Sequence, residues 1–121
     1  RLEAWRNAQD QGALAARNML GAEAEHAAVP WFWSDQYDHS LQIAGLSDEG
    51  RTVVRRDIGA GAFILFHLAE DGRLVAASGI GPGNAVARDI RLAEMLIVKG
   101  AKPAAAQLAA AEVKLKLLLA A

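Results

Sequence analysis

Few side chains in this sequence have the types and spacing that metal binding or acid–base catalysis requires. The three histidines, His26, His39 and His67, lie far apart and have no partner at the spacing of an H-x-x-x-H or paired-cysteine motif. Asp35 and Asp38 lie close together among aromatic side chains, which is one way to build a general acid, but capping or turn formation is the commoner role of aspartate there. We therefore predict no catalytic residue and no metal site.

Motifs for nucleophilic catalysis and nucleotide binding are also absent. The sequence has neither a G-x-S-x-G elbow nor a Walker loop, and without cysteine it has no thiol nucleophile, disulfide or thiolate metal site. The segment 79–84, Gly-Ile-Gly-Pro-Gly-Asn, resembles a dinucleotide loop, since glycines let the backbone approach phosphate at a helix N-terminus. It lacks the G-x-G-x-x-G register, and the strand before it is predicted to lie in an antiparallel hairpin. We interpret it as a strand-to-helix turn.

The strongest chemical signal is a cluster of aromatic residues. Four of the seven aromatic side chains lie within residues 31–37, beginning with Trp31-Phe32-Trp33. An indole ring usually needs both a surface to stack on and a polar partner for its N–H group. Two interpretations follow: the cluster fills a core or a domain interface, or it forms a wall that faces a cofactor.

Periodic apolar residues predict the helix and connector that must position this cluster. A helix is predicted from Leu2 to Leu20, with Gly21 as its left-handed C-terminal residue. Gly12, inside this helix, predicts a close neighbour, because glycine otherwise weakens a helix. Residues 22–40 are predicted to form an aromatic connector or irregular strand, since Pro30 favours extended backbone before the cluster.

The rest of the chain predicts an antiparallel sheet followed by helices. Alternating apolar residues predict four strands, over residues 41–46, 52–57, 62–69 and 74–80. The first two are expected to pair as a hairpin through residues 48–50, and the last two through the Asp71-Gly72 turn. A helix is predicted from its N-cap Asn84 to about Lys99, and another after Pro103, although residues 113–117 also fit a strand.

These elements predict an α+β fold, an antiparallel β-meander of about four strands with flanking helices. With 53% hydrophobic and 22% charged residues among 121, the chain has the composition of one packed domain rather than of a disordered segment. Its net charge of -1 argues against a nucleic-acid partner. No apolar run is long enough to cross a membrane, so we expect a soluble, cytoplasmic chain with no membrane partner. Because the chain begins at Arg1 inside an amphipathic pattern, we expect a piece of a longer protein.

Several stretches of the sequence resemble one enzyme family. Residues 29–38, Val-Pro-Trp-Phe-Trp-Ser-Asp-Gln-Tyr-Asp, and 41–46, Leu-Gln-Ile-Ala-Gly-Leu, are similar to the C-terminal domain of FAD-dependent NAD(P)H:ferredoxin reductases that serve oxygenases. This family includes putidaredoxin reductase and biphenyl dioxygenase ferredoxin reductase. Residues 1–21 resemble the last helix of the family's FAD domain, and residues 83–96 and 100–103 resemble its final helical segment. The resemblance covers nearly the whole chain.

The resemblance implies a glutathione-reductase-like architecture, in which domains for FAD and NAD(P)H precede an α+β interface domain. Residues 1–21 would then be the final helix of the FAD-binding domain, 22–40 the aromatic connector, and 41–121 the C-terminal domain. The fingerprints for both nucleotides would lie outside these residues. The chain alone is therefore expected to have no reductase turnover.

The resemblance also assigns roles toward the cofactor and the partner. Trp5 matches the family position that touches the flavin at the N-terminal end of the first helix, where the helix dipole can stabilise negative charge. Trp31 and Trp33 match the aromatic pair near the isoalloxazine ring, close to the surface that an iron–sulfur ferredoxin approaches. The resemblance therefore implies FAD as cofactor, NAD(P)H as substrate of the full-length protein, and a ferredoxin and the remainder of the reductase chain as partners.

Charged residues suggest where that ferredoxin would dock. The candidates to complement an acidic ferredoxin are Arg55, Arg56, Arg88 and Arg91, since such charges raise encounter rates, although a solvated position is commoner for any one of them.

The C-terminal helices depart from the family pattern at one place. Residues 108–112, Leu-Ala-Ala-Ala-Glu, stand where many relatives have Leu-Ala-Asp-Pro, a cap and stop signal. We expect its loss to fuse two short helices into one.

A rival hypothesis from another functional class fits the same residues. In it the chain is a structural interaction or dimerisation domain, and the aromatic cluster packs against a partner chain without meeting flavin. Such a patch on the isolated domain predicts self-association, because monomers rarely expose large apolar patches.

Overall fold

A computed structural model describes the whole chain, residues 1–121. It contains one five-stranded antiparallel sheet in the order β1-β2-β5-β4-β3. The strands are β1 (Trp31–Gln36), β2 (His39–Gly45), β3 (Thr52–Gly59), β4 (Ala62–Leu68) and β5 (Leu74–Pro82). The helices are α1 (Trp5–Met19), α2 (Ala87–Val98), α3 (Ala105–Ala109) and α4 (Leu115–Leu119), with a 3₁₀ turn, η1 (Ser47–Glu49). This arrangement confirms the predicted α+β class, with five strands in place of about four.

The pairing of the strands differs from the prediction at the N-terminal half of the sheet. The predicted hairpin between residues 41–46 and 52–57 is wrong, because β2 pairs with β1 and β5 while β3 pairs only with β4. The segment predicted as a connector over 22–40 divides at residue 31, where the sheet begins with β1. The predicted hairpin through Asp71-Gly72 is confirmed, with Gly72 at φ +83° in the turn between β4 and β5.

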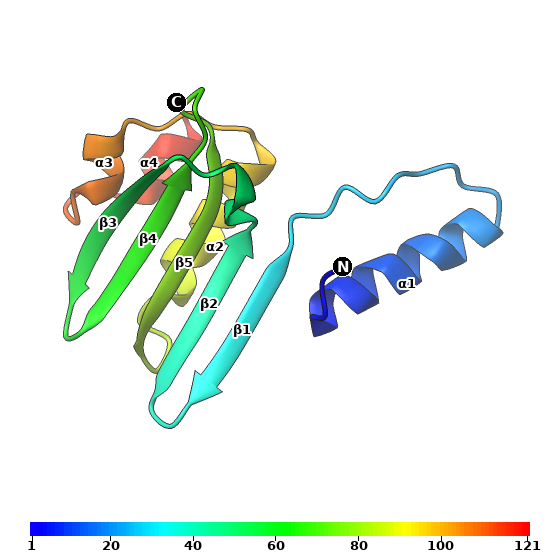
Figure 1. Cartoon of the computed structure of the whole chain (residues 1–121), viewed down its shortest axis with the longest axis horizontal. Coiled ribbons are helices and arrows are strands. Elements are labelled where there is room, and N and C mark those ends of the chain that lie inside the picture. The colour runs from blue at the N-terminus through cyan, green and yellow to red at the C-terminus, as the bar shows by residue number, and fades with distance from the viewer.

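Helices α2, α3 and α4 lie behind the sheet in Figure 1, and α1 projects from the edge formed by β1. The core lies between the sheet and α2, where Ile64 and Phe66 of β4 meet Ile90 and Leu96, all fully buried. Fully burying side chains of this size contributes about 1.5–3 kcal/mol each. Gly79 of β5 allows the close approach, since a Cβ there would lie 3.0 Å from atoms of Ile90 and of the preceding Val86.

The helices differ from the prediction in several respects. The second helix begins at Ala87 and has no side-chain cap, so Asn84 belongs to the preceding turn and is not the N-cap. The C-terminal segment is helical but forms α3 and α4, separated by a turn, so the expected fusion into one helix is wrong. Apart from the adjacent backbone of α1 itself, nothing lies within 4 Å of a Cβ added at Gly12, so the close neighbour predicted there is absent. Gly21 follows α1 with φ +99°, as predicted.

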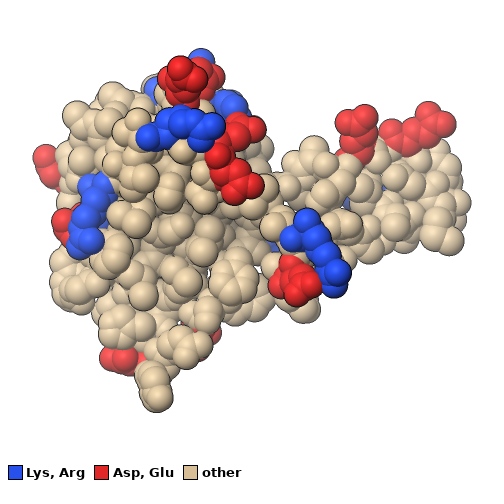
Figure 2. All heavy atoms as spheres, in the orientation of Figure 1, with Lys and Arg blue, Asp and Glu red and all other residues tan.

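The face of the sheet opposite α2 has no helix over it. Register and strand alternation place on this face Phe32, Leu41, Ile43, Phe63, Leu65 and Ile80, which we call the open face. All but Phe32 are half-buried by their neighbours. Figure 2, viewed from this side, shows charged side chains mainly around its rim. None of the helices is long and apolar enough to span a membrane.

Candidate cofactor-facing site

Strand β1 determines the directions of the aromatic side chains at residues 31–33. Trp31 pairs with Ala44, a core residue, so strand alternation places Trp31 and Trp33 on the α2 side of the sheet and Phe32 on the open face. Trp31 is half-buried and packs against the core, whereas Trp33 remains 44% exposed. Trp31 therefore supports the fold, and Trp33 presents an exposed indole surface.

Helix α1 brings the third predicted site residue to the same place. Trp5, in the first turn of α1, meets Trp33 edge to face, with ring centroids 6.0 Å apart and planes at 76°. This is a favourable geometry for an aromatic pair. Trp5 is 65% exposed, so the pair forms an aromatic corner with solvent on its outer side. The structure thus brings Trp5, Trp31 and Trp33 together from two segments distant in sequence.

A charged contact that the sequence analysis missed lies directly behind this corner. The guanidinium of Arg6 lies 5.6 Å from the ring centroid of Trp31, a cation–π distance, and its Nη2 lies 2.7 Å from Oε1 of Glu94. Glu94, on α2, is almost fully buried and also forms an ion pair with Arg91. Helical spacing places Glu94 next to the core residues Ile90 and Ala93, a position where a carboxylate needs a partner. That position is the only signal that the sequence carried.

The N-terminus of α1 has no capping side chain. Nδ2 of Asn7 donates a hydrogen bond to the carbonyl of Leu2 at 2.9 Å, and Oδ1 of Asn7 accepts one from Gln11 at 3.1 Å. No side chain caps the helix, and no acidic residue lies in its first turn. The first-turn N–H groups and the positive end of the helix dipole are therefore free to interact with a negative or electron-rich group.

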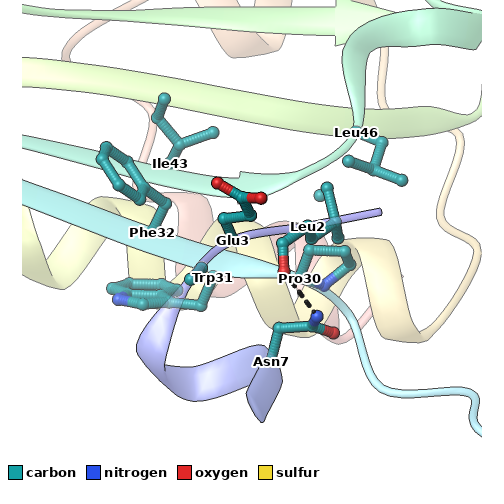
Figure 3. Close-up of a pocket in the computed structure, with 10 residues that line it drawn as sticks. Leu2, Glu3, Asn7, Pro30, Trp31, Phe32, Ile43 and Leu46 are labelled. Atoms are coloured by element: carbon teal, nitrogen blue, oxygen red, sulfur yellow. Dashed lines mark hydrogen bonds between the residues drawn. The ribbon is translucent and has the colours of Figure 1, made fainter.

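A cavity of about 210 Å³ lies where this N-terminus meets β1 and β2. Figure 3 shows Leu2 and Glu3 crossing the two strands, with Phe32 and Ile43 on one side and Pro30 and Leu46 on the other. Trp31 and the hydrogen bond from Asn7 lie beneath them. The lining is mostly apolar, and the carboxylate of Glu3 is its only charged group.

The histidines and aspartates considered for chemistry do not join this site. Asp38 forms a hydrogen bond with Nδ1 of His39 at 2.8 Å, which holds the pKa of Asp38 below its usual value, the opposite of what a general acid needs. His67 lies on β4, where burial lowers its pKa, and His26 lies in the segment between α1 and β1. No three histidine, aspartate or glutamate side chains come together as metal ligands.

The four arginines considered for docking have different surroundings. Arg56 is buried, so its assignment to a docking surface is wrong. Arg55 is paired with Asp57 at 2.7 Å and stacks over Phe63 on the open face, and Arg91 is paired with Glu94. Arg88 is exposed and has no ion pair; it lines a shallow hollow with Lys114 and Lys116.

Comparison with known proteins places the fold in a family. Residues 31–119 match a protein-family model described as Reductase C-terminal. The chain belongs to this family. It is 48% identical over 120 residues to the ferredoxin–NAD(+) reductase component of the anthranilate 1,2-dioxygenase system of Burkholderia cepacia, covering 98% of this chain and 29% of that protein. The family predicted from the sequence is therefore confirmed.

Solved structures agree with this assignment. The ferredoxin reductase for the CYP199A2 system of Rhodopseudomonas palustris matches with a TM-score of 0.83 and 29% identity, covering 97% of this chain and 28% of that one. A chain of the covalent putidaredoxin reductase–putidaredoxin complex matches with a TM-score of 0.84 and 25% identity, covering 99% of this chain and 28% of that one. The 121 residues thus span less than a third of the length of each of these relatives.

Proposed function

We propose that this chain is the C-terminal portion of a flavoprotein reductase that passes electrons from NAD(P)H through FAD to a ferredoxin serving an oxygenase. In this proposal residues 1–21 are the final helix of the FAD-binding domain, and the remaining residues connect it to and form the C-terminal domain. The whole enzyme would act in the cytoplasm. Membership of the reductase C-terminal family and similarity to ferredoxin–NAD(P)(+) reductases support the proposal.

The observation that carries the proposal is the aromatic corner of Trp5 and Trp33, backed by Trp31. Two large indoles that stay 65% and 44% exposed while touching each other suit a planar ring lying against them. FAD supplies such a ring and, when bound, accepts hydride from NAD(P)H and releases electrons singly to an iron–sulfur centre. This chain would supply the wall that shields the ring from water on one side.

The free N-terminus of α1 fits the same cofactor. Its uncapped first turn lies beside Trp5, so its N–H groups and dipole would face the pyrimidine edge of a ring placed against the corner. Negative charge developing on that edge would be stabilised there. Most of the FAD contacts, including those to its phosphates, would come from the remainder of the reductase chain.

The first experiment replaces the matching 120-residue segment of the anthranilate dioxygenase reductase with this chain and follows flavin fluorescence. Tryptophan against a flavin quenches its emission, so we expect Trp33→Ala and Trp5→Ala to increase the emission of the bound flavin. Phe32→Ala, on the opposite face of β1, is the matched control. Unchanged emission in both tryptophan variants, with FAD still bound, would show that Trp5 and Trp33 do not lie against the flavin and would contradict this part of the proposal.

A second experiment tests the part played by the chain alone. The 121 residues mixed with NADH, FAD and a ferredoxin are expected to show no electron transfer, because no nucleotide-binding loop is present. Measurable reduction of the ferredoxin above the rate without protein would contradict this expectation.

The surface charges bear on ferredoxin docking. Arg88 is the one member of the predicted arginine set that remains exposed and unpaired, and Lys114 and Lys116 lie beside it. In the grafted reductase, reversing the charge of Arg88 is expected to weaken ferredoxin reduction at low salt and to matter less at high salt. Equal rates at low salt would exclude Arg88 from the docking surface.

A second candidate function is a structural or dimerisation domain, and the open face is the observation that favours it. An uncovered sheet face carrying six large apolar side chains is a suitable surface for a protein partner. The two functions are distinguished by the fluorescence experiment, since only the reductase role requires Trp5 and Trp33 to meet flavin.

A further inference from the structure

We propose that Glu94 is a positioning residue that fixes α1 to the sheet and thereby sets the place of Trp5 beside Trp33. Its consequence for the flavin rests on the proposed function, whereas its effect on α1 does not. The proposal depends on how little else holds this helix.

Helix α1 has few connections to the rest of the fold. Asn7 is its only buried residue, and its exposed C-terminal end carries Met19 at 86% exposure. The ion pair between Arg6 and Glu94 is the only one that joins residues 1–21 to the remainder of the chain. An isolated helix of 15 residues is marginal in water, so the helicity of α1 depends on this attachment.

Glu94 is suited to this task because its side chain is buried and its helix, α2, is packed into the core. Its side chain is 5% exposed and lies on α2 among residues of the core. Arg91, on the same helix, neutralises part of its charge but cannot connect α1 to anything. The second carboxylate oxygen reaches across to Arg6, whose guanidinium also lies over Trp31. One guanidinium thus joins α1, α2 and β1.

The location of this contact links it to the site. Arg6 directly follows Trp5 in the first turn of α1, so holding Arg6 fixes the backbone that carries the Trp5 indole. The Trp31 ring under Arg6 and the Trp33 ring against Trp5 come from the same strand. Glu94 therefore acts on the aromatic corner through Arg6 and without touching it.

The test measures amide hydrogen exchange in the 121-residue chain for Glu94→Gln, Arg6→Met and the double variant. We expect exchange in residues 8–12 of α1 to become about tenfold faster in each single variant. The contribution of one charge-assisted hydrogen bond to local stability corresponds to a change in exchange rate of about this size. Exchange in β4 and β5 should stay slow. The double variant should be no faster than either single variant, because all three lose one contact.

The matched control is Asp10→Asn, which removes the pair between Arg6 and Asp10 within α1 at 3.9 Å and leaves Glu94 in place. It is expected to behave as wild type. If Glu94→Gln disturbs the whole fold, seen as fast exchange in β4, then Arg6→Met decides, since Arg6 lies at the surface of the contact. Unchanged exchange in α1 for Arg6→Met, or an equal effect of Asp10→Asn, overturns the proposal.

A flavin readout in the grafted reductase separates this proposal from the proposed function. Faster exchange in α1 together with increased flavin emission in Glu94→Gln supports both. Faster exchange with unchanged flavin emission supports the positioning role and contradicts the flavin wall. Unchanged exchange overturns the positioning role whatever the flavin does.

Discussion

The guanidinium of Arg56 connects the sheet to the C-terminal residues. It donates hydrogen bonds to four carbonyl groups in the last turn of α3 and in the turn that follows it, those of Leu108, Ala110, Ala111 and Val113, at 2.7–3.2 Å. Its Nε has no hydrogen-bond partner, but Asp89 lies 3.8 Å away and supplies the opposite charge. This side chain fixes the turn between α3 and α4, next to the buried Leu108 and Leu115.

Replacing Arg56 should therefore affect stability. Arg56→Met removes all four hydrogen bonds and leaves the carbonyl groups of Leu108, Ala111 and Val113 without this donor, whereas that of Ala110 still accepts from the N–H of Val113, so we expect a loss of about 3 kcal/mol in the free energy of unfolding. Urea unfolding followed by circular dichroism measures this loss. Arg55→Met, on the exposed side of the same strand, is the control and should have a far smaller effect. Equal effects of the two variants would contradict the role given to Arg56.

His67 gives stability a dependence on pH. Its ring lies on β4 between Val53 and Ala76 of the neighbouring strands, without a charged partner, and burial lowers its pKa. The unfolded chain therefore takes up the proton first as pH falls through about 6.5, so stability decreases in that window. We expect the urea midpoint to fall less between about pH 7.5 and 5.5 in His67→Gln than in wild type. The same fall in both proteins would assign the dependence to other groups.

Which residues the sequence could identify depended on whether their roles were local. Trp31 and Trp33 were identified by the clustering of aromatic residues and Trp5 by the family resemblance, and the structure brings them together. Arg56 was wrongly assigned to a docking surface. Its sequence neighbours do not reveal that residues 108–113, about 50 positions later, cover its side of the strand. Glu94 was missed for the same reason, since its partner lies on α1.

At the scale of elements, the pairing of β2 with β5 requires a glycine at position 45. Gly45 ends β2 with φ +79°, and a Cβ there would lie 2.1 Å from the carbonyl oxygen of Val75 on β5. We expect Gly45→Ala to cost about 2 kcal/mol or more, because both the backbone angle and the contact are unfavourable. Thermal unfolding monitored by calorimetry measures this cost.

Gly12 is the matched control because it lies in open space in the middle of α1. Gly12→Ala should leave the sheet unchanged and should strengthen α1 by about 1 kcal/mol, the difference in helix propensity. A destabilising effect at Gly12 would mean that another part of the molecule packs against α1. A neutral effect at Gly45 would contradict the close approach of β2 and β5.

The prediction succeeded where a clear local signal was present and failed where pairing depends on a distant partner or on an irregular strand. The β4–β5 hairpin and the apolar face of α2 follow from a turn signal and a period, both contained within about 20 residues. One of the two partners of β2 is β5, more than 30 residues away, and alternation indicates which side of a strand is buried but not what it pairs with. Residues 22–40 are predicted as an aromatic connector or irregular strand because Pro30 favours extended backbone, and this local signal does not identify β2 as the partner of β1.

At the scale of the whole molecule, two surfaces remain uncovered. One is the outer side of α1, and the other is the open face, whose central residue Ile80 lies between Leu41 and Phe63. A helix held at one end, with exposed Met19 and Leu20 at the other, suits packing against the proposed FAD-binding domain. The open face suits contact with another protein surface, since few charges interrupt it (Figure 2).

The open face predicts that the 121-residue chain associates with itself. Because contact between two such faces removes apolar surface from water, we expect sedimentation velocity to show a dimer whose fraction rises with concentration. Ile80→Lys places a charge at the centre of the face and should return the chain to a monomer. Met95→Lys, on the exposed side of α2, is the control and should leave the dimer intact. Loss of the dimer in Trp33→Ala with Ile80→Lys unaffected would instead assign association to the aromatic corner, and the open face would then have no part in it.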